Sequence, residues 1–182
     1  MADEHSLLMR AHELEEDALA EIFDTYYRRL YRYIYHHTCH VQTAEDLTAR
    51  VFHRLLEALH RGTGPNRHLK PWLFRVAHNL VIDDGRRRHH TETPLHERFL
   101  PVSSDLEAAT DQAIAIQHVQ MALGSLTTGQ RSVIILHFLE GLEYREIAQV
   151  MNSTVGAVKA LQNRGLAALR RQLEPTYQGE QP

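Results

Sequence analysis

Residues 143–159, with the sequence EYREIAQVMNSTVGAVK, contain the pattern that decides the fold. They predict a short helix with Ile147, Ala148 and Met151 on its inner face, then a tight turn at Asn152 and Ser153, whose side chains bond readily to nearby backbone. The next helix has an inner face of Val158, Leu161, Gly165 and Leu169 and an outer face of Lys159, Asn163, Arg164 and Arg170. This layout is typical of a helix-turn-helix, whose second helix enters the major groove of duplex DNA. The alternative is an ordinary helical hairpin within a bundle.

Hydrophobic residues recur at helical spacing through most of the remaining chain. Thr43 and Asp46 resemble a capping box that would start one helix, and Pro71 suits the first turn of another because its missing N–H needs no partner there. Strand-like alternation and internal repeats are absent from the sequence, so the predicted class is all-α. The predicted helices cover residues 17–37, 43–59, 71 to the basic run at 86–90, 113–126, 133–139, 143–151 and 154–173.

Two stretches rich in turn-forming residues interrupt this periodicity. The first is the loop at 60–68, and the second, around residues 89–108, contains Pro94, Pro101, Ser103 and Ser104. We therefore expect two small helical domains joined by a flexible linker. The expected limits are an acidic N-terminal tail at 1–12, a first domain at 13–92, a linker at 93–109, a second domain at 110–174 and a C-terminal tail at 175–182.

Composition excludes several classes of protein. The 182 residues include 20 Lys and Arg against 23 Asp and Glu, and 43% are hydrophobic, which is ordinary for a globular chain. The single cysteine, Cys39, excludes an internal disulfide framework and fits a reducing cytosol. The sequence lacks an apolar run near the roughly 18 residues of a membrane span, and it opens with acidic residues rather than a signal peptide. We expect a soluble, cytoplasmic protein.

Charge is distributed unevenly along the chain. Residues 1–24 hold eight acidic side chains and one basic one, whereas basic residues cluster at 67–88 and 159–171. This pattern indicates weak affinity for nucleic acid in isolation, strengthened by a protein partner. Solvated helix faces would give the same pattern.

Aromatic and basic side chains are interleaved in the third predicted helix and its flanks. Flat rings stack on unpaired bases while cations follow phosphates, which is the pattern of single-stranded nucleic-acid binding. The alternatives are that Trp72 belongs to the core and that the basic run interacts with a helix dipole. The residues concerned are Trp72, Phe74 and His78, with Lys70, Arg75 and Arg86–Arg88, and the amide of Asn79.

These segments, in this order, resemble a known family. Residues 72–83 followed by Arg86–Arg88 resemble region 2 of bacterial sigma factors of the extracytoplasmic-function (ECF) group, within the sigma-70 family. Residues 130–142, 144–148 and 158–159 resemble their region 4. The resemblance covers about 10–95 and 110–173. It implies a protein that is not an enzyme and needs no cofactor, and that binds core RNA polymerase, recognises −10 and −35 promoter elements and promotes initiation of transcription.

The resemblance also implies partners and roles for particular residues. The clamp of the largest polymerase subunit would be contacted by Glu45, Asp46, Leu47, Arg50 and Phe52. The −10 element would be contacted by a loop that holds a flipped base, with Asn66, Arg67 and His68, and by Trp72, Arg75, His78, Asn79, Arg86, Arg87 and Arg88. The −35 element would be contacted by Arg145, Thr154, Ala157, Lys159, Asn163 and Arg164. The flap of the second-largest subunit and an anti-sigma factor would be further partners, and the linker would thread toward the RNA exit path.

Several positions depart from the family pattern. Ala49 and Arg50 stand where Gln and an acid are usual, which changes the expected clamp contact in detail. Thr127 replaces a common proline. Ala157, Ala160 and Leu161 replace Thr, Ser and Arg, which leaves more of the −35 contact to Lys159, Asn163 and Arg164.

Two other functions are compatible with parts of the sequence. His36, His37, Cys39 and His40 form a cluster that could bind metal or sense thiol chemistry, but without a second cysteine we expect a polar helix end and no metal. A stand-alone helix-turn-helix regulator with a helical regulatory domain would bind duplex DNA tightly without polymerase. His137 lies on a core stripe and is expected to be a buried, hydrogen-bonded ring.

Overall fold

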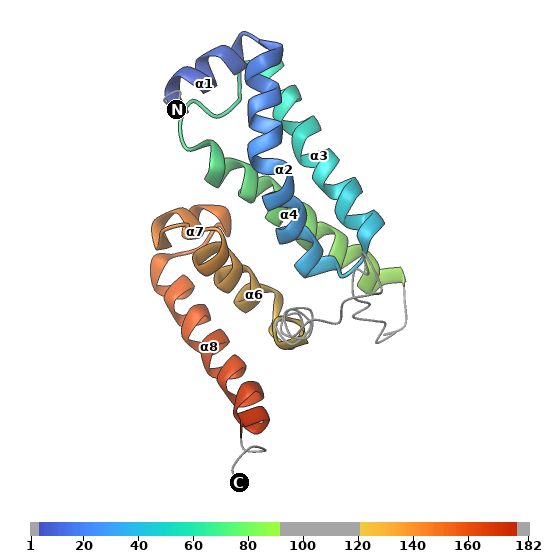
Figure 1. The fold of residues 1–182 in the computed structure, drawn as a ribbon, viewed down its shortest axis with the longest axis vertical. Coiled ribbons are helices and arrows are strands. Elements are labelled where there is room, and N and C mark those ends of the chain that lie inside the picture. Colours follow the sequence, from blue (N-terminus) through green and yellow to red (C-terminus); the bar gives the residue numbers. More distant parts are fainter. Residues whose placement is uncertain (1–3, 92–120, 178–182) are drawn as a thin grey trace.

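The computed structural model describes residues 4–91 and 121–177, and throughout these ranges the regular elements are helical (Figure 1). The all-α prediction is therefore confirmed. The expected linker at 93–109 and most of the predicted helix at 113–126 lie outside the described residues, although 121–124 are helical. The elements are α1 (Glu4–His12), α2 (Glu16–Thr38), α3 (Val41–His60), α4 (Leu69–Thr91), α6 (Thr128–Ile134), the π-helical turn η1 (Ile135–Leu139), α7 (Tyr144–Val150) and α8 (Val155–Tyr177).

The N-terminal half, α1–α4, is built on the mutual packing of α2, α3 and α4. The stretch that we assigned to an acidic tail forms α1, which buries Leu7, Leu8 and Ala11 against this bundle. Figure 1 shows α1 at the same end of the bundle as the loop between α3 and α4. The largest fully buried side chains of this half are Leu8, Ile22, Leu30, Tyr33, Ile34, Leu69, Leu73, Phe74 and Leu80.

The joint between α2 and α3 corrects one expectation. Cys39 adopts a left-handed conformation (φ 51°) and its N–H donates to Tyr35 O at 2.8 Å, which ends α2. His40 then caps α3, because its Nδ1 accepts from the N–H of Thr43 at 3.2 Å. The capping box predicted at Thr43 is therefore wrong: α3 begins at Val41, two residues earlier, because an imidazole nitrogen serves as the cap acceptor.

The C-terminal half, residues 121–177, contains the helix-turn-helix. A capping box between Thr127 and Gln130 starts α6. The following π-helical turn ends at Leu139, and two residues later Gly141 adopts a φ of 65°, a left-handed conformation that favours glycine. Gly165 of α8 packs so closely on α6 that an added Cβ would lie 3.3 Å from Ile134 Cγ1, which confirms that it faces inward.

The two halves pack against each other through α4 and α7. One hydrophobic cluster contains Leu73, Phe74 and Ala77 of α4 together with Ile135, Leu136 and Ile147 of the C-terminal half. We call this arrangement the closed form. Across the described ranges, the structure holds no helix that combines the length and the apolar character of a membrane span.

Candidate nucleic-acid interface

The second helix of the helix-turn-helix starts with a side-chain cap. The hydroxyl of Thr154 accepts from the N–H of Ala157 at 3.2 Å, and the turn before it contains Asn152 in a left-handed conformation (φ 48°). From this start α8 presents Lys159, Asn163 and Arg164 to solvent. Arg145 is exposed on α7, whereas Ala157 is half-buried. The predicted cationic face of α8 therefore exists, and Val158 lies fully buried on the opposite side.

The aromatic ring of Tyr144 on α7 contacts Lys159, one of the cations of this face. The ring of Tyr144 stacks on His137 with 4.7 Å between centroids, and its hydroxyl donates to Gln162 Oε1 at 2.8 Å. The ammonium of Lys159 lies 5.3 Å from the centroid of the same ring, a cation–π contact. His137 Nδ1 donates to the carbonyl of Leu142 at 3.0 Å, so the ring is hydrogen-bonded as expected, although it is half-buried.

The predicted −10 residues of α4 differ in their exposure to solvent. Arg75, Asn79 and Arg86 are exposed at spacings that place them on one side of α4, and Arg87 is exposed beside them. Trp72 is half-buried. Arg88 donates to Asp84 Oδ2 at 2.8 Å and to Thr38 O at 3.4 Å, so it is engaged within the N-terminal half. His78 is buried between the halves and would meet DNA only if they separated.

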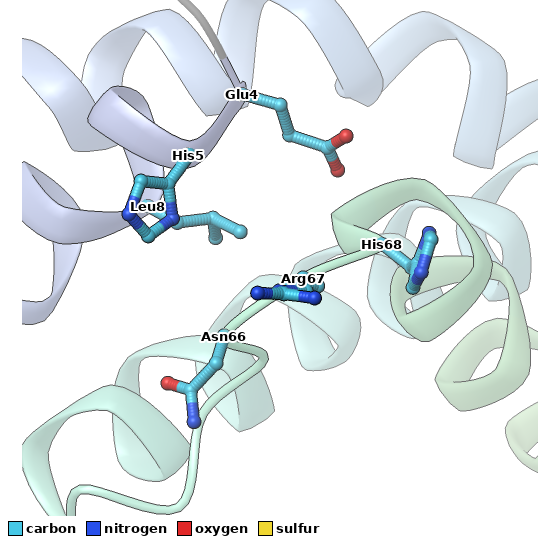
Figure 2. A pocket seen from close by; sticks show the side chains of 6 residues that line it. All are labelled: Glu4, His5, Leu8, Asn66, Arg67 and His68. Carbon is cyan, nitrogen blue, oxygen red and sulfur yellow. The ribbon is translucent and has the colours of Figure 1, made fainter.

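The loop before α4 displays Asn66, Arg67 and His68 to solvent. His68 holds a left-handed conformation (φ 57°), and its carbonyl accepts from the N–H of Trp72 at 3.1 Å, so the loop ends where α4 begins. These three side chains line a cavity together with residues of α1, which Figure 2 shows from close by.

The predicted polymerase-binding residues of α3 divide by burial. Glu45, Asp46 and Arg50 are exposed, whereas Leu47 and Phe52 are buried. The ring of Phe52 packs on Phe23, 4.8 Å away, and on Tyr27, 6.4 Å away. Burial, and then the nearby charge of Glu45, raise the pKa of Tyr31 on the adjacent face of α2. The helix that carries these charged groups therefore packs on α2 through aromatic rings.

A buried glutamate joins the two halves, and sequence reasoning missed it. The side chain of Glu140 is 1% exposed and its Oε2 accepts from Arg29 Nε of α2 at 2.8 Å. Arg32 Nη2 approaches Oε1 at 3.6 Å. The backbone carbonyl of Glu140 accepts from Arg29 Nη2 at 3.2 Å and from Lys70 Nζ of α4. We call this set the Glu140 contact.

A second polar cluster lies deeper in the same interface. The Tyr33 hydroxyl lies 2.9 Å from His78 Nδ1 and 3.2 Å from Ser132 Oγ, and Ser132 Oγ lies 3.3 Å from His37 Nε2. Burial lowers the pKa of His78 to about 4, lowers the pKa of His37 well below its usual value and raises the pKa of Tyr33. The cluster is therefore neutral at physiological pH.

Arg131 ties the C-terminal half to the end of α2. Its guanidinium donates to the carbonyls of Leu123, Gly124 and Leu126, at 2.8–3.2 Å, and to the carbonyl of His36 at 2.9 Å. Burial, followed by the charges of Arg32 and Arg131, lowers the pKa of His36 to about 4.

The histidine cluster at 36–40 is divided among separate roles. His36 and His37 face the interface, Cys39 ends α2 and His40 caps α3. In the part of the chain that the structure describes, no group of three His, Cys, Asp or Glu side chains is placed to hold a metal ion.

The fold and these surfaces define a helical DNA-binding protein of two parts, with a helix-turn-helix in its C-terminal part. Family models agree with this division: "Sigma-70 region 2" matches residues 22–91 and "Sigma-70, region 4" matches residues 116–169. The chain belongs to the ECF group of the sigma-70 family, which directs RNA polymerase to promoters and is not enzymatic. The match to region 2 favours this function over a stand-alone helix-turn-helix regulator.

Individual relatives support the same family. SigX of Bacillus subtilis, an ECF RNA polymerase sigma factor, is 30% identical over 170 residues, covering 87% of this chain and 85% of SigX. BldN of Streptomyces coelicolor is also an ECF RNA polymerase sigma factor. It is 34% identical over 175 residues, and the match covers 92% of this chain but 64% of BldN. This chain also superposes on CnrH, which was solved in complex with the cytosolic domain of CnrY, with a TM-score of 0.73 and 23% sequence identity. The match covers 94% of this chain and 97% of CnrH and shows a similar fold.

Proposed function

We propose that each half of the chain contacts one promoter element. The observation that carries this proposal is that exposed cations occur on two different helices, one per half: Arg75 and Arg86 on α4, and Lys159 and Arg164 on α8. The α8 face suits the major groove of the −35 duplex, where N-terminal residues of a recognition helix meet base edges. The α4 face and residues 66–68 suit the unpaired strand of the −10 element.

We further propose that the exposed groups of α3 dock on the clamp of the largest polymerase subunit. Glu45, Asp46 and Arg50 face solvent within about one and a half turns of helix, while Leu47 and Phe52 anchor α3 in the bundle. Charged groups on such a surface contribute mainly to orientation and association rate. The C-terminal half would meet the flap of the second-largest subunit.

Promoter binding requires the closed form to open. The −10 and −35 elements lie about 25 base pairs apart by their names, or about 85 Å along B-DNA at 3.4 Å per base pair. In the closed form Lys70, two residues from His68, contacts Glu140, three residues before the helix-turn-helix begins. The two halves are thus in direct contact at these residues in the closed form, so they are held together rather than spread over a span of this length. Core polymerase would supply the free energy that separates them.

An anti-sigma factor would keep the chain from polymerase. CnrH was solved in complex with the cytosolic domain of CnrY, and the sigma factor RpoE of Bartonella quintana in complex with the anti-sigma factor NepR. We propose a partner of this kind for this chain, one that binds the closed form in preference to the open form.

Transcription in vitro tests the proposed function. Core polymerase free of other sigma factors would be mixed with this chain and genomic DNA from the same source, and the 5′ ends of the transcripts would be sequenced. We expect starts that share a pair of upstream sequence elements. Starts that are unchanged by adding the chain, together with tight duplex binding by the chain alone, would refute it.

A further inference from the structure

The three cations of the Glu140 contact have no acidic partner in their own half of the chain. Arg29 and Arg32 of α2 pair with the Glu140 carboxylate, and Lys70 of α4 donates to the Glu140 carbonyl. Among the described residues, no acid of the N-terminal half forms an ion pair with any of the three. Opening of the closed form therefore leaves three positive charges side by side without a counter-charge.

Other basic side chains of the N-terminal half are neutralised by acids of that half. The local pairs are Arg10 with Glu15 and Glu21, Arg61 with Glu57, and Arg88 with Asp84. The contrast indicates that Arg29, Arg32 and Lys70 are placed for an anion that comes from outside the N-terminal half. In the closed form this anion is Glu140.

The donors of this site surround three oxygens. The guanidinium of Arg29 contacts two of them, the carboxylate Oε2 of Glu140 through Nε at 2.8 Å and the backbone carbonyl through Nη2 at 3.2 Å. Arg32 Nη2 approaches the other carboxylate oxygen, Oε1, at 3.6 Å, and Lys70 Nζ contacts the carbonyl. An arginine fork binds phosphate oxygens as well as carboxylate oxygens. The site is therefore suited to a phosphate group.

Repulsion between the cations makes the open site unfavourable without a ligand. Burial, and then the charge of Arg29, lower the pKa of Lys70, whereas Glu140 and Glu146 of the C-terminal half raise it. Separation of the halves takes both acids away from Lys70, so the repulsion between Lys70 and Arg29 is no longer offset. An anion that binds in place of Glu140 restores the balance of charge.

Promoter DNA is the anion that the proposed function brings to this side of the N-terminal half. Lys70 follows His68 by two residues, at the end of the loop that we propose for the −10 element. A strand that contacts this loop would pass the N-terminal end of α4, where Lys70 lies. A phosphodiester offers two oxygens that share one negative charge, as the Glu140 carboxylate does.

We propose that Arg29, Arg32 and Lys70 form a site for a backbone phosphate of promoter DNA, and that Glu140 occupies this site in the closed form. The inference rests on the proposed function, which supplies the DNA and the open form. Glu140 is then an internal competitor of the promoter, because the same cations hold the halves together in the free chain and hold DNA in the complex. The residues that the family resemblance assigns to the −10 element include none of these three cations.

The salt dependence of promoter binding tests this site. Holoenzyme assembled from core polymerase and the full chain has the open form under the proposed function, so its DNA affinity no longer includes the cost of opening. We expect the double variant Arg29→Gln, Lys70→Gln to lower the slope of log affinity against log salt concentration by about one. Its loss of affinity should then be roughly eightfold larger at 50 mM salt than at 500 mM salt. Arg10→Gln removes a charge that acids of its own half balance, and should leave the slope unchanged.

Neutral phosphates locate the contact on the DNA. Promoter fragments would carry a methylphosphonate in place of one phosphate at a time. We expect one replacement to weaken binding of the unmodified holoenzyme and to have no effect on binding of the double variant. A thermal melt of each chain checks that the variants fold.

The possible outcomes separate this inference from the proposed function. An unchanged salt slope in the double variant, or equal methylphosphonate effects in the two holoenzymes at every position, would overturn the inference. Weaker assembly with core polymerase at an unchanged salt slope would also overturn it, because the site would then bind an acidic group of polymerase. If the unmodified holoenzyme shows no promoter preference at all, the proposed function fails and this inference fails with it.

Discussion

The Glu140 contact makes a quantitative prediction about opening of the closed form. The Glu140 carboxylate is 1% exposed in the closed form, and Arg29→Ala removes its donor at 2.8 Å, which leaves Arg32, at 3.6 Å, as the other ion-pair partner. Removing one partner of a buried ion pair costs about 3–5 kcal/mol. Because Arg32 offsets part of this cost, we expect about 3 kcal/mol. Opening the interface hydrates the carboxylate, so this penalty falls on the closed form alone.

The expected result is an increase of roughly a hundredfold in the equilibrium constant for opening, at about 1.4 kcal/mol per tenfold change. Ser132 is fully buried in the interface, so a thiol placed there reacts only after opening. The assay measures the labelling rate of Ser132→Cys in a Cys39→Ser background, with and without Arg29→Ala, under conditions in which closing is faster than labelling.

Arg32→Ala is the matched control. The Arg32 side chain is 63% exposed, and exposed ion pairs contribute about 0–1 kcal/mol, so the labelling rate should rise less than about fivefold. Equal rates in Arg29→Ala and the unmodified background would refute the reasoning, and so would equal acceleration by both arginine variants.

Three further predictions concern pH, polymerase and DNA. The pKa values of His36 and His78 are about 4 in the closed form and 6.5 when exposed, so the unfolded state takes up protons first as pH falls. The free energy of unfolding should therefore drop by about 3 kcal/mol between pH 7.5 and 5.5. Denaturant titrations at the two pH values measure this difference, and an unchanged free energy of unfolding would contradict it. Asp46→Arg should weaken binding of core polymerase at least tenfold in a pull-down titration. The control Glu13→Arg makes the same charge change at another exposed residue and should not weaken binding. Equal binding by the two variants would count against the clamp assignment. Arg164→Ala should lower −35-dependent transcription about tenfold, because it removes a contact of about 1–3 kcal/mol. Arg171→Ala serves as the control. Full transcription from Arg164→Ala would show that this residue does not contact the −35 element.

Local patterns in the sequence were sufficient for α2, α3, α4 and the helix-turn-helix, but not for α1. The spacing of Ile147, Ala148 and Val158 predicted buried positions, and all three are buried. Lys159 and Arg164 were predicted to face solvent and do so. Such predictions succeed because helical period and turn chemistry depend on neighbouring residues.

Contacts between distant parts of the chain could not be predicted in this way. Glu140 and Arg29 are 111 positions apart, and an acid before a glycine carries no local signal of burial. The buried hydroxyl of Tyr33 needs a polar partner, and Ser132 supplies one from the other half, 99 positions along the chain. The wall that Glu4 contributes to the cavity was missed because the acidic N-terminus suggested a tail.

The distance between the two halves tests the central claim most directly. Donor and acceptor dyes would be attached to His53→Cys on α3 and Arg170→Cys on α8, both exposed, in the Cys39→Ser background. We predict efficient energy transfer in the free chain and a loss of transfer, from a separation of tens of ångströms, when core polymerase and promoter DNA are added. Unchanged transfer in a complex that makes promoter-specific transcripts would contradict the account.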